Sequence, residues 1–304
     1  QLWIALCYAP VRNSGGEGMG VLAFVGATLL GTVVATPPDK ANNKATDEDV
    51  IVVTGERVTR QQIKRFVDEL VYYPRGIQPA RWTQRICPSV HGLRAPLSSR
   101  VEARMRTVAE AAGLVPDKEK CVPNVIVIVT PDKRAFLSML ARRDSFYFDG
   151  IPFWRVNEII RNPSLAVSWH LDGLPVSPGG RDVQGINRTT EAASRQRFTQ
   201  APTFDAAVVV IDAKGLEGLT TTQLADYASM RAYVRVRPGR LSAPTSASIL
   251  GVIDAPADAE VPASLTRWDL GFLRGMYSSD PYVATGAQRS QVGKSVEKAL
   301  TSEP

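Results

Sequence analysis

The sequence predicts an α+β domain in which helices pack on a mixed β-sheet, and three observations support this fold class. Two runs rich in β-branched residues, 124–130 and 205–212, are apolar throughout their interiors, which is typical of central strands buried on both faces. Apolar residues recur at helical spacing over 96–114, which begin with a proline and end beside Gly113, a C-cap residue. A third run, 165–171, alternates like a half-exposed or edge strand, so a regular doubly wound parallel sheet is not expected.

The other expected elements follow the same two periodicities. Helical spacing predicts further helices over residues 57–73, 131–143, 154–161, 220–231, 265–277 and 286–300. Short β-branched runs predict strands over residues 50–53, 233–237 and 248–253. We expect irregular structure over 82–93 and a long loop over 173–203, which are rich in Gly, Pro, Arg and Thr.

Composition favours an ordinary globular protein. The chain has 304 residues, of which 44% are hydrophobic and 22% charged, so a sizeable core is expected. The formal net charge is +6, but the basic residues are spread along the chain and form no patch or tail. A nucleic-acid reader usually concentrates its charge, so we expect a basic solvated surface and no nucleic-acid partner.

The N-terminal region differs from the rest. Residues 20–35 carry no charge and end in Val33-Val34-Ala35, which suits the apolar core and cleavage site of a secretory signal. We therefore expect an upstream segment and signal peptide over 1–35 with its start at Met19, a polar linker over 36–48, and a single domain over 49–304. An uncleaved membrane anchor and a buried N-terminal helix are the alternatives. The signal predicts a periplasmic or secreted protein without an integral membrane domain in the mature chain.

Cysteine usage is consistent with export. Cys7 precedes the expected cleavage site, which leaves Cys87 and Cys121 in the mature chain. An even count in an exported chain predicts a disulfide, although two unrelated buried thiols are the alternative. No Cys-x-x-Cys occurs, so neither a redox motif nor a zinc ribbon is predicted.

Several enzyme signatures are missing from the sequence. We find no phosphate loop, no G-x-G-x-x-G after a strand, no G-x-S-x-G and no H-E-x-x-H. The two histidines, His91 and His170, lie on separate segments that are not expected to be helical. We therefore predict no metal and no cofactor, although His170 near Asp172 leaves open a hydrolase with an unrecognised site.

Two segments resemble zincin-type metalloprotease domains. Residues 265–277 read L-T-R-W-D-L-G-F-L-R-G-M-Y, which is similar to the helix that closes many zincin domains. Residues 205–230 resemble the preceding strand and the active helix, which in zincins carries the two zinc histidines. The resemblance places Gln223 and Tyr227 at these two positions, and neither a glutamine amide nor a neutral phenol is a good zinc ligand. It therefore implies a zincin-like fold that has lost its metal.

The stretch from Cys87 through Cys121 to the following strand resembles a group of exported alphaproteobacterial proteins with no assigned activity. Together the resemblances imply a non-catalytic exported protein that binds a peptide or envelope protein in a degenerate protease-like cleft. Candidate contacts are His170, Asp226, Trp154 and the loop residue Arg181. The alternatives are the hydrolase, and an envelope structural or assembly factor whose arginines meet anionic polymers.

The aromatic residues between the third and fourth expected helices have two interpretations. Tyr147, Phe148, Phe153 and Trp154 surround the turn Gly150-Ile151-Pro152. They could line a peptide groove, because aromatic residues anchor interfaces, or they could pack in the core beneath a loop.

Overall fold

A four-stranded mixed sheet organises the part of the chain described by the computed structural model, which covers residues 58–71, 78–178, 197–237, 247–256 and 259–302. The strand order is β1 (Pro88–His91), β2 (Val125–Thr130), β4 (Ala201–Asp212) and β3 (Ala166–Val176). β1, β2 and β4 run parallel, and β3 pairs antiparallel with β4 at one edge. The predicted mixed sheet with packed helices is confirmed.

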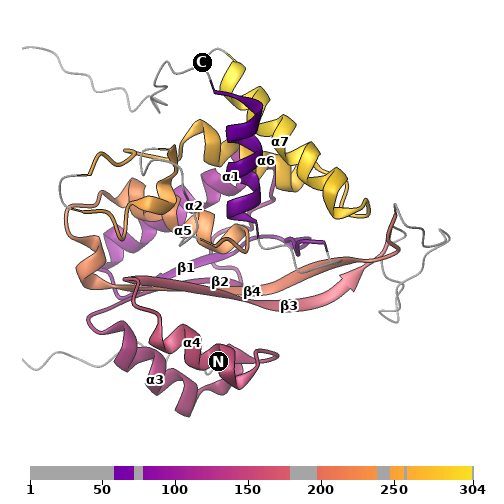
Figure 1. Ribbon diagram of the computed structural model, residues 1–304. Coiled ribbons are helices and arrows are strands. Elements are labelled where there is room, and N and C mark those ends of the chain that lie inside the picture. The colour runs from indigo at the N-terminus through magenta and orange to yellow at the C-terminus, as the bar shows by residue number, and fades with distance from the viewer. Residues whose placement is uncertain (1–57, 72–77, 179–196, 238–246, 257–258, 303–304) are drawn as a thin grey trace, which may run out of the picture. The chain divides into compact units, whose positions relative to one another are not determined.

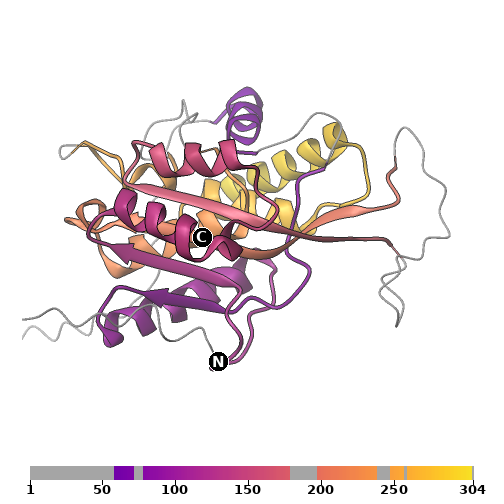
Figure 2. The same ribbon diagram turned by 90° about the horizontal axis from the view of Figure 1, so that it is seen from below.

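Helices cover both faces of this sheet (Figures 1 and 2). Within the described residues, five helices lie on one face: α1 (Arg60–Leu70), α2 (Ala95–Ala112), α5 (Thr221–Tyr233), α6 (Arg267–Ser278) and α7 (Thr285–Thr301). α3 (Lys133–Arg143) and α4 (Phe153–Arg161) lie on the other. Along β4, Val209 and Ile211 join the larger core, and Val208 and Val210 join the smaller one. Burial on both faces explains why this run is apolar without interruption.

The predicted helices and central strands are confirmed within the described residues, with bounds that differ by a few positions. The predicted strand at 50–53, the signal segment and the linker lie outside the described residues. No helix in the described ranges is long and apolar enough to cross a membrane.

The sequence suggested irregular structure over residues 82–93, and this is wrong for part of the segment. They contain β1, which pairs Pro88 with Val125 and His91 with Ile128 at the edge of the sheet. The strand has only four residues and begins with proline. Proline is tolerated at the first residue of an edge strand, but it weakens any sequence-based strand signal.

Two predicted strands are wrong. Tyr233 is the last residue of α5, where its hydroxyl donates to the carbonyl of Met105, and Val236 forms only an isolated bridge with Val71. The segment 248–253 instead contains a 3₁₀ turn, η5 (Ile249–Gly251). Its start is fixed by Asp269 on α6, whose carboxylate accepts hydrogen bonds from Ser248 Oγ (2.6 Å) and Ile249 N (2.9 Å). Tertiary hydrogen bonding thus overrides β-propensity here.

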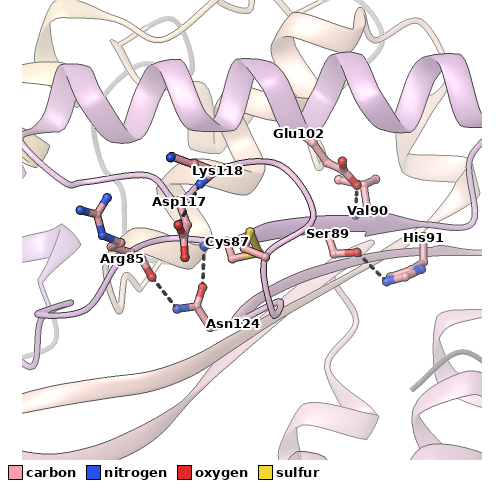
Figure 3. The surroundings of a disulfide bond; sticks show 10 residues. Arg85, Cys87, Ser89, Val90, His91, Glu102, Asp117, Lys118 and Asn124 are labelled. Carbon is pink, nitrogen blue, oxygen red and sulfur yellow. Dashed lines mark hydrogen bonds between the residues drawn. A yellow bond between two sulfur atoms is a disulfide. The ribbon is translucent and has the colours of Figure 1, made fainter. Parts of the chain in front are cut away.

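The predicted disulfide between Cys87 and Cys121 is confirmed (Figure 3). It ties the residue before β1 to the segment that leads into β2. The side chain of Asn124 supports this junction, because Oδ1 accepts from Cys87 N (2.8 Å) and Nδ2 donates to the carbonyl of Arg85 (2.7 Å). The covalent link therefore fixes the end of the sheet at which the short strand β1 begins.

Removal of this disulfide should destabilise the domain. Closing a loop with a sequence separation of 34 residues restricts the unfolded chain and contributes about 4 kcal/mol in the chain-entropy description. We expect the double variant Cys87→Ser/Cys121→Ser to unfold at lower denaturant concentration, with a free energy of unfolding lower by about 2–4 kcal/mol. Equal stability of the variant and the oxidised parent protein would contradict this role.

Candidate functional site

The sequence-predicted positions Gln223, Asp226 and Tyr227 all lie on α5, which packs between the sheet and the outer helices (Figure 1). The helix begins with a capping box, in which Thr220 Oγ1 accepts from Gln223 N and Gln223 Oε1 accepts from Thr220 N. Gln223 Nε2 also donates to the carbonyl of Pro262 (2.8 Å). Gln223 therefore closes the start of the helix and attaches it to the segment before α6.

Tyr227, one turn further along α5, is part of a buried polar chain. Its hydroxyl accepts from Arg231 Nη1 (2.7 Å), and Arg231 Nε donates to Ser168 Oγ (3.0 Å) on β3. Burial raises the pKa of Tyr227, so the phenol stays neutral at physiological pH. The two positions that the resemblance assigns to zinc ligands thus hold an amide and a phenol that are used in hydrogen bonds within the protein.

Asp226 faces a different neighbour. Its fully buried carboxylate accepts from Arg104 Nε (2.8 Å) and Arg104 Nη2 (3.2 Å) on α2, and from Leu265 N (2.6 Å). Bidentate pairing with a guanidinium is the strongest kind of ion pair that side chains form. Asp226 therefore joins α5 to α2 and to the residues that lead into α6, and it does not face an open cleft.

His170 is also enclosed, between α5 and β4. Its Nε2 lies 2.9 Å from the carbonyl of Ala232, which accepts a second bond from Trp82 Nε1 (3.0 Å), and its ring lies 4.3 Å from that of Phe204. A carbonyl only accepts, so Nε2 carries the proton. Burial lowers the pKa of His170 to about 3, which keeps the imidazole neutral.

The structure does not pair His170 with Asp172. The carboxylate of Asp172 binds Arg235 instead, at the exposed end of β3. His91 lies on β1, at the opposite edge of the sheet from His170, and hydrogen-bonds Ser89 (3.0 Å). Among the residues that the structure describes, no three His, Cys, Asp or Glu side chains gather in a group that could hold a metal ion.

The aromatic residues around Gly150 divide between the two interpretations. Phe148 is buried and stacks on Trp169 with ring centroids 4.8 Å apart. Phe153 and Trp154 are 80% and 68% exposed at the start of α4. Because α4 covers the opposite face of the sheet from α5, the structure does not bring Trp154 to Asp226 or His170. The predicted contact Arg181 lies outside the described residues.

A polar cluster beside the start of β3 was not anticipated from the sequence. Lys133 directly follows the loop after β2, and its buried ammonium donates to the carbonyls of Asn162 (2.8 Å) and Ser164. Burial lowers the pKa of Lys133. Asp254 accepts from Ser164 Oγ (2.5 Å) and Leu165 N (2.9 Å), which anchors the segment after η5 to β3.

Arg231 is another residue of the site that the sequence analysis did not single out. A signal for it was present, because Gln223, Tyr227 and Arg231 recur every four residues and so share one side of α5. Its partner Ser168 lies 63 residues away in sequence, so the contact itself could not be inferred from spacing.

The chain was compared with protein-family models, curated proteins and solved structures, and none of them matches it. The site is therefore interpreted from its own geometry.

The neutral, buried state of His170 predicts a specific acid sensitivity. In the unfolded chain a histidine binds a proton below its ordinary pKa of 6.5, whereas the folded protein binds it only near pH 3. The contribution of His170 to the free energy of unfolding is thus complete above pH 6.5 and is lost as the pH falls toward 3. Between pH 7 and 4.5, the parent protein should lose about 2–3 kcal/mol more free energy of unfolding than His170→Gln, which keeps an N–H donor.

Denaturant titrations of both proteins at each pH measure this difference directly. Because every other titrating group is shared, an identical decline in the two proteins would show that His170 does not carry the effect.

Proposed function

We propose that this chain is an exported, non-catalytic binding protein with a zincin-like fold, in which the metal-binding positions have become part of the core. The observation that carries the proposal is the burial of Gln223 and Tyr227 in hydrogen bonds to Pro262 and Arg231. An amide and a neutral phenol that already make these hydrogen bonds provide neither zinc ligands nor a general base.

The arrangement of elements supports the zincin-like part of the proposal. The long helix α2 is followed by the core strand β2, then by α3 and α4, the antiparallel edge strand β3, and β4, which leads into α5. α6 then occupies the place of the closing helix, although its capping box of Thr266 and Asp269 is a common feature of helix starts and is not specific to zincins. The resemblance implies a long helix, a core strand, an edge-like strand, the active helix and the closing helix in this order, and the described chain contains these elements with α3, α4 and β4 in addition.

A binding role is supported by the free edge of the sheet. β3 is the last strand in the sheet order, and its regularly paired part, residues 166–171, has no described strand on its outer side. This regular part of the edge offers main-chain donors and acceptors to an extended peptide, which would add as a further strand. The proposed ligand is therefore a segment of peptide or of an envelope protein.

Export is supported by two features of different kinds. The uncharged segment 20–35 suits a secretory signal. The disulfide between Cys87 and Cys121 is the type of bond that persists in an oxidising compartment.

Zinc content tests the non-catalytic assignment. We expect tag-free protein, incubated with zinc and freed of the excess, to retain far less than one zinc ion per chain by elemental analysis. A zincin with its histidines, treated in parallel, serves as the positive control. Stoichiometric zinc in this chain, together with peptide hydrolysis that a chelator abolishes, would contradict the proposal.

A further inference from the structure

We propose that Arg231 forms a carboxylate-binding site at the edge of β3, so that the ligand of this protein is an extended peptide with an acidic side chain. This inference rests on the proposed binding role and specifies its chemistry.

The first argument is the burial of a guanidinium without a carboxylate. Arg231 is only 5% exposed. Its hydrogen-bond partners are the neutral hydroxyl groups of Ser168 and Tyr227, and its charge lies 5.5 Å from the centre of the Tyr227 ring. No described Asp or Glu lies within ion-pair distance of it. A buried charge that is not paired is costly, so such a position in a stable protein points to an external anion.

The contrast with Arg104 strengthens this argument. Arg104 lies on α2 and is more exposed than Arg231, yet it has a bidentate carboxylate partner in Asp226. The neighbouring residues Asp226 and Tyr227 on α5 thus each contact an arginine, but with different chemistry. One arginine receives an acid from the chain itself, and the other receives a phenol.

Asp254 does not complete the site. Asp254 influences the pKa of Tyr227 and therefore lies in the same region. Its two carboxylate oxygens accept from Ser164 Oγ and Leu165 N, which commits them to the start of β3. Arg231 Nη2 has no hydrogen-bond partner among the described residues. The described side-chain atoms that are fully enclosed and lack a hydrogen-bond partner do not include Nη2. Because Nη2 lacks a partner, it must therefore be in contact with solvent.

The position of Ser168 indicates from which side of the protein an anionic side chain could reach Arg231. Ser168 pairs with Val209 in β4, and its side chain points toward α5. A peptide strand added to the outer edge of β3 would place one side chain beside Ser168, at a Cβ separation of about 5 Å. A glutamate or aspartate there would reach the guanidinium that Ser168 contacts. Arginine suits this task because it presents several donors to a carboxylate in one plane.

The test uses the full, disulfide-bonded chain and two short capped peptides of alternating threonine and valine, which differ only in a central glutamate or glutamine. Binding is followed by fluorescence anisotropy at constant ionic strength. The parent protein should bind the glutamate peptide about tenfold more tightly than the glutamine peptide, as expected for a charge-assisted hydrogen bond. In Arg231→Met this preference should disappear, whereas Arg142→Met, which removes an exposed arginine of α3, should retain it.

The outcomes separate the two proposals. Equal binding of both peptides by the parent protein would overturn the carboxylate site and leave the binding role intact. Binding of neither peptide would overturn both. If Arg231→Met fails to fold, Arg231→Lys replaces it, and a preference that is unchanged in this variant would also contradict the bidentate site.

Discussion

The buried carboxylate of Asp226 is the contact on which the helical layer of this protein depends. It accepts two hydrogen bonds from Arg104 on α2 and one from the backbone of Leu265, just before α6. An unpaired carboxylate in this position would be several kcal/mol less favourable, so the three donors must be present together. Asp226 therefore sets the position of α5 relative to the two helices beside it.

Once α5 is held in this way, its two ends are fixed as well. Gln223 closes its first turn against Pro262, and the carbonyl of Ala232 in its last turn receives His170 and Trp82. All residues from Gln223 to Tyr233 are buried. Apart from the 5% exposed Arg231, these side chains are used in contacts within the protein, which suits a structural role better than a catalytic one, where reacting groups must meet the substrate. For this reason the proposed binding site lies at the edge of the sheet and not along the enclosed sides of α5.

Sequence patterns predicted those parts of the fold in which one local signal dominates. β2 and β4 were predictable because burial on both faces leaves an uninterrupted apolar run, and α2 was predictable because proline and Gly113 mark its ends. β1 was missed because four residues beginning with proline carry almost no periodic signal. The segment at 248–253 was predicted wrongly because its conformation is decided by Asp269, about twenty positions away.

The candidate site shows the same difference between features with a local sequence signal and features that depend on distant contacts. Gln223 and Tyr227 were singled out by the resemblance to the zincin active helix, but their burial depends on contacts with Pro262 and with Arg231. Asp226 could be named as a polar position, whereas its pairing with Arg104 spans 122 residues and has no sequence signature. Hydrogen bonds between distant segments therefore decide which polar residues of α5 are structural, and spacing alone does not.

A double-mutant cycle on Arg104 and Asp226 tests this account most directly. Free energies of unfolding are measured for the parent protein, Arg104→Ala, Asp226→Asn and the double variant. We predict that Asp226→Asn costs about 3–5 kcal/mol and that the double variant loses about 1–3 kcal/mol less than the sum of the single losses. Additive losses, within about 0.5 kcal/mol, would show that the pair is not coupled and would contradict the structural role assigned to α5.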